Sequence, residues 1–217
     1  MRERDGCDEA CALEDLVRRA ADAGAQVVVT PEYAISARAE ALGPVGQRPP
    51  PEMPLQHRFG RLSDELNVLL FLQLITVDDG TLRNTLLALD DGRLLGAHHK
   101  FELYGEENGS MTAGDSPTVV TTRFGRVGLL VCADLYGPPA FHVATAEADV
   151  VVVAAQWTVA GAPQWPAAFA HDWMVPVVAS NGSGSAAAGG GIFDRRGRPQ
   201  GGRLSGLPIV MSRLEPP

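Results

Sequence analysis

One apolar run punctuated by glycine constrains this chain more than any other stretch, because it leads into a cysteine. The run covers residues 124–139 and reads FGRVGLLVCADLYGPP. It is too short to cross a membrane and is rich in valine and leucine, so it predicts a buried strand that ends at Cys132. In open α/β sheets, ligands bind beyond the carboxyl ends of the strands, which is where this thiol would lie. The alternative is that Cys132 is one more small core residue, the commoner fate of a buried free cysteine.

Length and charge bound the class of protein. The 217 residues suffice for one well-buried domain and are short for two, so we expect a single domain over residues 1–217. The net charge of -8 argues against a nucleic-acid partner, because phosphate binding needs a basic face. No window has the apolar length of a membrane span, and residues 1–6 lack the apolar core of a signal peptide. We therefore expect a cytoplasmic protein without a membrane partner.

The cysteine count offers little beyond Cys132. Three cysteines cannot make a closed disulfide framework, and all are compatible with a reducing compartment. Cys7 and Cys11 lie four residues apart and would share one face of a helix. A metal site would need two more ligands at suitable spacing, and none is nearby in the sequence. We expect no metal there, and the role of these two cysteines stays open.

Lysine usage is more informative. Lys100 is the only lysine, and the other members of the Lys+Arg total of 18 are arginines. A chain that uses arginine nearly everywhere, yet keeps a lysine at one place, suggests that this place needs a compact ammonium group. The alternative is a lone surface lysine in an arginine-biased composition. Its sequence neighbours, described below, favour a functional role.

The order of predicted elements indicates a mixed α/β sheet protein with helices on the outside. Apolar periodicity predicts helices at residues 12–23, 55–67, 141–148 and 162–173. Short apolar runs predict strands at residues 26–30, 68–77, 84–89, 94–99, 118–122, 125–131, 150–155, 175–179 and 208–211. Asp90-Asp91-Gly92 is a strong hairpin signal, and residues 41–54 and 101–117 are expected to be loops.

Four polar side chains stand just past predicted strand ends: Glu32, Lys100, Glu107 and Cys132. If the strands are neighbours, these side chains converge on one rim. A free thiol has a pKa of about 8.5, so it needs a base or a cation to become an efficient nucleophile at neutral pH. Glu32 can take the proton, and Lys100 can stabilise the thiolate and the oxyanion formed on a carbonyl or nitrile substrate. Glu107 would hold the ammonium and help orient the leaving group.

These residues lie in motifs that resemble the nitrilase superfamily of carbon-nitrogen hydrolases. The motifs are Thr30-Pro31-Glu32-Tyr33, the segment HKFELY at residues 99–104, and Val131-Cys132-Ala133-Asp134, with Glu107 ahead of Gly114-Asp115. The likeness runs from about residue 13 to the C-terminus. In finer detail, residues 103–108 and 179–181 look most like the vanin and biotinidase branch, whose members cleave amides of pantetheine or biotin.

The resemblance implies an α-β-β-α sandwich that acts as a homodimer or higher homo-oligomer, with no metal and no organic cofactor. It implies hydrolysis of a non-peptide C–N bond of a small linear amide, through a thioester on the cysteine that water releases. The backbone N–H of Ala133 would complete an oxyanion hole, and Asp134 would brace the nucleophile turn. Tyr136 and Trp157 would line the substrate pocket, although large aromatics at strand ends are as often core.

Two departures from the family pattern stand out. The family usually opens with a strand ahead of the first helix, and residues 1–12 do not read as one, so that strand is expected to be lacking or replaced. Ala133 also stands where the family often has an aromatic residue, which leaves room beside the nucleophile.

Two other functions stay open. The same acyl-enzyme could be resolved by an amine, which would make an amide-forming or acyl-transfer enzyme. The chain could also be a catalytically lapsed binding or scaffold protein with this fold. The histidines His98, His99, His142 and His171 are expected to be structural, since adjacent residues on a strand point to opposite faces and cannot both line one site.

Overall fold

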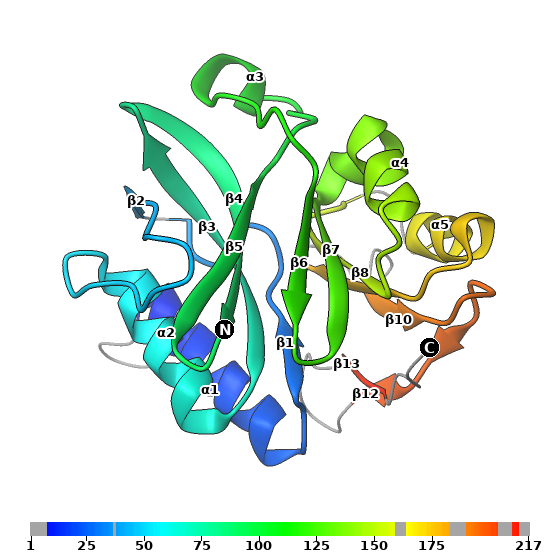
Figure 1. Cartoon of the computed structure of the whole chain (residues 1–217), viewed down its shortest axis with the longest axis horizontal. Coiled ribbons are helices and arrows are strands. Elements are labelled where there is room, and N and C mark those ends of the chain that lie inside the picture. Colours follow the sequence, from blue (N-terminus) through cyan, green and yellow to red (C-terminus); the bar gives the residue numbers. More distant parts are fainter. Residues whose placement is uncertain (1–7, 37, 159–163, 183–189, 204–209, 213–217) are drawn as a thin grey trace.

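The computed structural model describes residues 8–36, 38–158, 164–182, 190–203 and 210–212. It stacks two β-sheets face to face, with helices on both outer sides (Figure 1). Apolar cores fill all three spaces between these layers. The protein is therefore a mixed α/β chain with the expected α-β-β-α layering.

The elements have the following bounds. The helices are α1 (Glu9–Asp22), α2 (Pro54–Leu66), α3 (Glu107–Ser110), α4 (Pro138–Thr145) and α5 (Gln164–Trp173), and a 3₁₀ turn, η1, covers Cys132–Tyr136. The strands are β1 (Val27–Val29), β2 (Ala39–Ala41), β3 (Leu69–Asp78), β4 (Thr81–Asp90), β5 (Arg93–His99), β6 (Thr118–Thr122), β7 (Gly125–Val131), β8 (Val150–Ala155), β9 (Val177–Asn181), β10 (Gly191–Phe193), β11 (Pro199–Gln200), β12 (Gly202–Arg203) and β13 (Val210–Met211).

The first sheet has the strand order β1-β3-β4-β5, with β2 also paired to β3. Its hairpins turn at Asp79-Gly80 and Asp91-Gly92, and all four residues have positive φ. Two consecutive residues with positive φ are typical of the tight turns that match the twist of paired strands, so the expected hairpin at residues 90–92 is confirmed. β4 pairs with β3 along its whole length from Thr81, which makes it three residues longer at its start than predicted.

Helices α1 and α2 cover the outer face of this sheet (Figure 1). The side chain of Asp8 caps α1 by accepting a hydrogen bond from the backbone N–H of Cys11 at 2.9 Å. α2 begins at a proline and ends at Asn67 in the left-handed conformation, both of which suit helix ends. The buried face of α1 consists of Ala10, Leu13, Val17 and Ala20.

The second sheet has the order β11-β10-β9-β8-β7-β6, and the cysteine strand β7 lies next to the edge strand β6. β7, β8 and β9 run parallel and are covered on both faces, which explains why they read as near-continuous valine-rich runs. α4 and α5 pack on the outer face. At Gly128 of β7, a Cβ would overlap Val143 of α4, so the helix can approach the strand only over a glycine.

The inner faces of the two sheets meet in a dry core. Its buried members are Leu69, Phe71, Leu86, Ala88, Val120, Val127, Leu129, Val131, Val152 and Ala154. Cys132 packs against this core and also against the core beneath α4 and α5. The turn that carries Cys132 is therefore held from both sides by packed side chains.

Several boundaries differ from the sequence expectations. Within the described residues no strand precedes α1, while residues 1–7 lie outside them. A short strand, β2, covers Ala39–Ala41, where no strand was predicted, and the loop predicted at residues 101–117 contains the single-turn helix α3. α4 starts at Pro138 rather than at residue 141, because proline is well tolerated in the first turn of a helix. The expected strand at 208–211 falls partly outside the described residues.

No described helix combines the length and apolar character that a membrane crossing requires.

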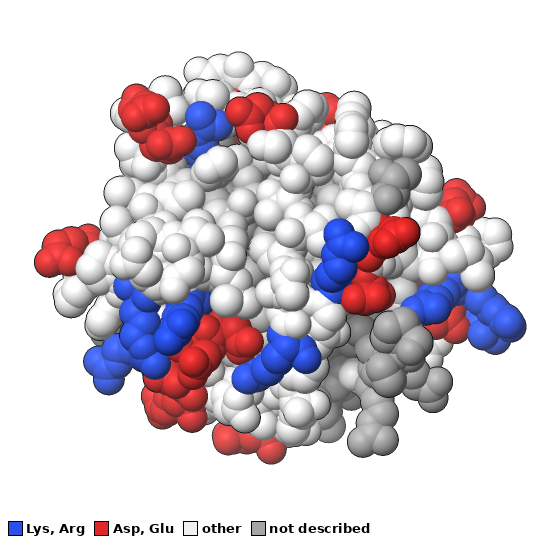
Figure 2. All heavy atoms as spheres, in the orientation of Figure 1, with Lys and Arg blue, Asp and Glu red and all other residues white. Residues whose placement is uncertain are grey.

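Charges of both signs are mixed on the face shown in Figure 2, where arginines near α1 and α2 lie close to acidic side chains. Arg18 pairs with Glu14 at 2.8 Å and with Glu65 at 2.7 Å, and Arg58 also reaches Glu14 at 2.7 Å. These pairs are partly exposed, so each contributes little to stability. Their arrangement gives this face no extended basic stretch.

Candidate active site

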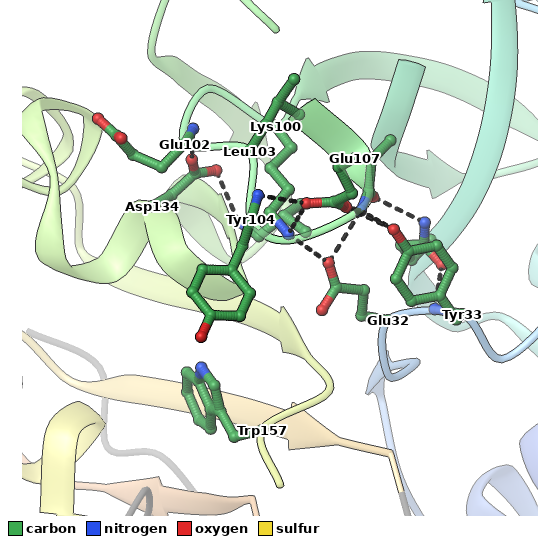
Figure 3. Close-up of polar contacts among 12 residues, drawn as sticks. Glu32, Tyr33, Lys100, Glu102, Leu103, Tyr104, Glu107, Asp134 and Trp157 are labelled. Atoms are coloured by element: carbon green, nitrogen blue, oxygen red, sulfur yellow. Dashed lines mark hydrogen bonds and ion pairs between the residues drawn. The ribbon is translucent and has the colours of Figure 1, made fainter. Parts of the chain in front are cut away.

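Three of the predicted catalytic side chains meet in a buried cluster (Figure 3). Glu32 follows β1, Lys100 follows β5, and Glu107 opens α3, and these residues are only 3%, 2% and 6% exposed. Lys100 Nζ donates to Glu32 Oε1 at 2.8 Å and to Glu107 Oε2 at 2.7 Å. The lone lysine thus lies between two carboxylates that are far apart in the sequence.

Cys132 lies at the junction of β7 and η1, within reach of this cluster. Its sulfur interacts with the carboxyl group of Glu32 and with the backbone of Gln156. The positive charge of Lys100 acts on its pKa. The residue has a φ of 49°, a left-handed conformation that is uncommon outside glycine. Such strained backbone is found at functional sites, where the surrounding structure holds it in place.

Burial shifts the pKa values of the thiol and of the neighbouring carboxyl group. Burial and then the negative charge of Glu32 raise the pKa of Cys132 to about 12, against the opposing positive charge of Lys100. Burial also raises the pKa of Glu32, and Lys100 offsets part of that rise. At neutral pH the sulfur therefore rests as a thiol, and a base must remove its proton as it attacks.

Glu107 has the opposite character. Burial alone would raise its pKa, but hydrogen bonds from Lys100, Tyr33, the backbone of Tyr104 and Asn84 lower it below the ordinary value. The Tyr104 N–H donates at 2.8 Å and the Asn84 amide at 2.8 Å, and the Tyr33 hydroxyl also donates to this carboxylate. Glu107 is thus a fixed anion. When environments push the pKa values of two carboxylates apart, they separate the roles of the two groups.

Lys100 stays charged despite its burial. Burial alone would lower its pKa, but the negative charge of Glu32, that of Cys132 once its sulfur is ionised, and the hydrogen bonds to the two glutamates raise it. Its backbone is fixed as well, because its N–H donates to Asn84 O at 2.7 Å and its C=O accepts from Gly114 N at 2.8 Å. A Cβ at Gly114 would overlap the carbonyl oxygen of His99, which explains the glycine at this step.

Asp134 connects the lysine segment to the nucleophile turn. Its Oδ1 accepts from the backbone N–H groups of Phe101 at 3.0 Å and Glu102 at 2.7 Å. Its Oδ2 accepts from Val131 N at 3.0 Å and contacts His98 Nε2 at 2.8 Å. The carboxylate therefore braces the turn, as expected, and also fixes the chain that follows the lysine.

His98, His99 and His142 contact other groups of the fold, as predicted, whereas His171 is exposed beside Asp172. His98 bonds Asp134 on one side of β5, and the ring of His99 contacts Thr85 Oγ1 at 2.8 Å. His142 contacts the carbonyl of Pro138 at 2.9 Å within α4. Adjacent histidines on one strand therefore serve different faces, and neither reaches the lysine cluster.

An aromatic wall lies beside the thiol. The rings of Tyr136 and Trp165 meet edge to face with centroids 4.8 Å apart, and Trp165 meets Trp157 in the same way at 5.8 Å. Burial raises the pKa of Tyr136, and a negative charge on Cys132 would raise it further. Figure 3 shows Trp157 on the same side of the site as Tyr104.

Trp157 and Ala133 take different positions. Trp157 is buried in the core beneath α5, and its Nε1 has no hydrogen-bond partner within the described part of the chain. Ala133 directly follows the nucleophile in η1 and is partly buried. The predicted pocket and oxyanion roles of these residues stay predictions.

A cavity of about 590 Å³ lies elsewhere, between α2 and the β4–β5 turn. Its lining consists of Arg48, Pro49, His57, Arg61, Asp64, Glu65 and Gly92. None of the predicted catalytic residues contributes to it. We therefore place the candidate active site at the buried cluster, where charge and burial converge, and not at this cavity.

Sequence reasoning missed Asn84 and Gln73, and it assigned no role to Tyr33. Asn84 contacts both glutamates of the buried cluster, and Gln73 contacts Asn84. The available signal was a polar amide within each of two predicted apolar strands, since buried polar side chains are uncommon without a partner. The hydrogen-bond partners of these two amides depend on the register of β3 and β4, which the sequence does not give.

Comparison with known proteins decides the family. The model of the carbon-nitrogen hydrolase family matches residues 11–184. This chain belongs to the carbon-nitrogen hydrolase family. It is 31% identical over 85 residues to a hydrolase of Schizosaccharomyces pombe, covering 35% of this chain and 26% of that protein. It is 29% identical over 100 residues to a probable nitrilase of the same yeast, covering 44% and 37%. These alignments span well under half the length of either relative.

Solved structures show the same fold. Saccharomyces cerevisiae Nit3, a member of branch 10 of the nitrilase superfamily, matches with a TM-score of 0.73 at 19% identity, covering 88% of this chain and 78% of that one. An amidase from Nesterenkonia sp. matches with a TM-score of 0.73 at 21% identity, covering 90% and 80%. These relatives give the vanin and biotinidase assignment no support.

Proposed function

We propose that this carbon-nitrogen hydrolase family member cleaves the C–N bond of a small linear amide through a thioester on Cys132. The observation that carries the proposal is the buried Glu32–Lys100–Glu107 cluster beside a protonated thiol. A base, a fixed cation and a nucleophile are what acyl transfer through sulfur requires. The amidase among the structural neighbours agrees with this choice of substrate class.

In the first half-reaction, Glu32 takes the thiol proton while Cys132 sulfur bonds the carbonyl carbon and the carbonyl electron pair moves to oxygen. The ammonium of Lys100 has three N–H donors, and two of them hold the glutamates. The third can serve the new oxyanion, together with the backbone N–H of Ala133. One preorganised donor of this kind contributes on the order of 3 kcal/mol, about a hundredfold in rate.

The first half-reaction ends when the oxyanion re-forms the carbonyl, Glu32 gives the proton to the leaving nitrogen and the C–N bond breaks, which leaves the thioester. Water then attacks the thioester carbonyl while Glu32 takes its proton, and sulfur leaves as the carboxylic acid forms. The proton passes back to the sulfur, which restores the resting thiol. Glu107 stays ionised throughout and keeps the ammonium in place.

A panel of small linear amides tests this function. We expect release of ammonia or amine together with a thioester mass adduct on the wild-type chain, and neither with Cys132→Ala, which should fold normally because it removes only one sulfur atom. The absence of both signals across the panel would favour the lapsed binding protein. An amine added with the amide distinguishes hydrolysis from acyl transfer, because only transfer gives the new amide.

The assembly and location are further proposals. The family resemblance supports a homodimer or higher homo-oligomer without a metal or organic cofactor, and the cytoplasmic location is proposed from the sequence alone. Multi-angle light scattering of the purified chain measures the assembly directly. A monomer at working concentration would contradict it.

A further inference from the structure

Two amide side chains lie behind the catalytic glutamates, where the sequence alone would place apolar residues. Gln73 of β3 is 0% exposed and Asn84 of β4 is 1% exposed. Neither can reach solvent, so both must be satisfied by protein groups. Their hydrogen bonds form a chain that ends on Glu32 and Glu107.

That chain starts from a donor whose identity is unambiguous, the backbone N–H of Tyr33. It donates to Gln73 Oε1 at 2.6 Å, which fixes the orientation of the Gln73 amide. Gln73 Nε2 must then face Asn84 Oδ1, at 2.8 Å. Tyr33, which follows Glu32, has a left-handed φ of 57°. This backbone conformation directs its N–H toward Gln73 Oε1.

The orientation of Asn84 follows from that of Gln73. Because its Oδ1 accepts from Gln73, its Nδ2 faces the carboxylates and donates to Glu32 Oε1 at 2.8 Å and to Glu107 Oε1 at 2.8 Å. Glu32 Oε1 also accepts from Lys100. Glu32 Oε1 thus accepts hydrogen bonds from both Asn84 and Lys100, whereas Glu32 Oε2 accepts none from these two residues.

We propose that Asn84, oriented by Gln73, is a positioning residue that makes Oε2 of Glu32 the atom that takes the Cys132 proton. The inference rests on the proposed function. Asn84 also bridges two carboxylates that would otherwise repel each other across Lys100. The groups that face Glu32 are Lys100 after β5, Glu107 of α3, Cys132 of η1 and, beside it, Tyr33.

Asn84→Asp is the decisive variant, because it keeps the shape and replaces the donor with an acceptor. A third carboxylate opposite Glu32 Oε1 favours protonation of Glu32. The readout is the rate at which iodoacetamide alkylates Cys132, measured by intact mass at a series of pH values. This measurement needs no substrate. We expect the acid limb of this profile, where the rate falls as Glu32 takes up a proton, to move up by about one pH unit, so that the rate at a fixed pH on that limb falls about tenfold.

Thr85→Val is the matched control. Thr85 is the next residue on β4, is fully buried, and bonds Thr76 Oγ1 at 2.6 Å and His99 Nδ1 at 2.8 Å, away from the glutamates. This variant should lower the melting temperature without shifting the acid limb of the alkylation–pH profile. A folded Asn84→Asp chain with a wild-type limb would overturn the proposal.

Gln73→Met covers the case in which Asn84→Asp does not fold. It removes the amide that orients Asn84 without touching either glutamate, and we expect the same direction of shift with smaller size. If both variants fail to fold, or Gln73→Met leaves the profile unchanged, the amides are structural and the proposal fails. If no amide acylates the wild-type chain, the result counts against the proposed function. The alkylation profiles would still test the role of Asn84, because they need no substrate.

Discussion

At the scale of single residues, the use of one lysine among 18 cationic side chains now has a physical basis. Lys100 is enclosed by carboxylates at 2.8 and 2.7 Å and has almost no solvent exposure. A compact ammonium fits such a space and directs a donor toward each neighbour, whereas a guanidinium is larger and presents a planar fork.

Lys100→Arg should therefore slow Cys132 acylation at least a hundredfold, about the worth of one preorganised oxyanion donor. Intact-mass kinetics with an amide that acylates the wild type measure the rate, and circular dichroism checks the fold. Arg19→Lys is the control, because Arg19 pairs with Asp15 on the exposed face of α1 and should leave the rate unchanged. Wild-type acylation by Lys100→Arg would show that any cation serves.

At the scale of elements, the site depends on how strand ends are joined. The segment after β5 is held to β4 through Lys100 N and to residue 114 through Lys100 O. Asp134 joins the same segment to η1. The lysine follows one sheet and the cysteine follows the other, and the Asp134 carboxylate fixes them relative to each other by accepting backbone N–H groups from both segments.

Gly114→Ala tests this connection. Its Cβ would overlap the carbonyl oxygen of His99, so the segment that carries Lys100 must shift. We expect a melting temperature several degrees lower and at least a tenfold loss of acylation rate, since misplacement of about 1 Å can cost a hundredfold.

Gly109→Ala is the matched control for this substitution. It lies in α3 of the same loop, and its Cβ would meet nothing within 4 Å. It should retain the wild-type rate and gain slightly in helix stability. Equal effects of the two substitutions would contradict a specific role for Gly114.

The sequence predicted the elements more completely than their connections. Motifs at strand ends located Glu32, Lys100, Glu107 and Cys132, because a polar residue after an apolar run is visible in one dimension. The partnership of Gln73 and Asn84 was not visible, because it depends on the β3–β4 register, in which Asn84 pairs with Ile75. The left-handed backbone of Cys132 likewise arises from tertiary contacts, since nothing in its sequence demands a positive φ.

At the scale of the whole molecule, the two glutamates act on stability with opposite signs. The folded pKa of Glu32 is raised, so its contribution to stability is present below its unfolded pKa and is lost as pH rises through the folded value. The folded pKa of Glu107 is lowered, so its contribution is present at neutral pH and is lost as pH falls. At pH 7 the ionised base therefore costs stability, while the fixed anion supplies it.

Two isosteric substitutions separate these contributions. Glu32→Gln should raise the melting temperature at pH 7, and Glu107→Gln should lower it, because the latter leaves Lys100 with one carboxylate and presents an amide to four donors. For a chain of this size, each 1 kcal/mol corresponds to about 2–4 °C. Thermal unfolding at pH 7 and at pH 4 measures both variants, and their differences from wild type should shrink at the lower pH as the carboxyl groups take up protons. A Glu32→Gln chain that is less stable than wild type at pH 7 would show that the base is held for stability, contrary to the role assigned to it.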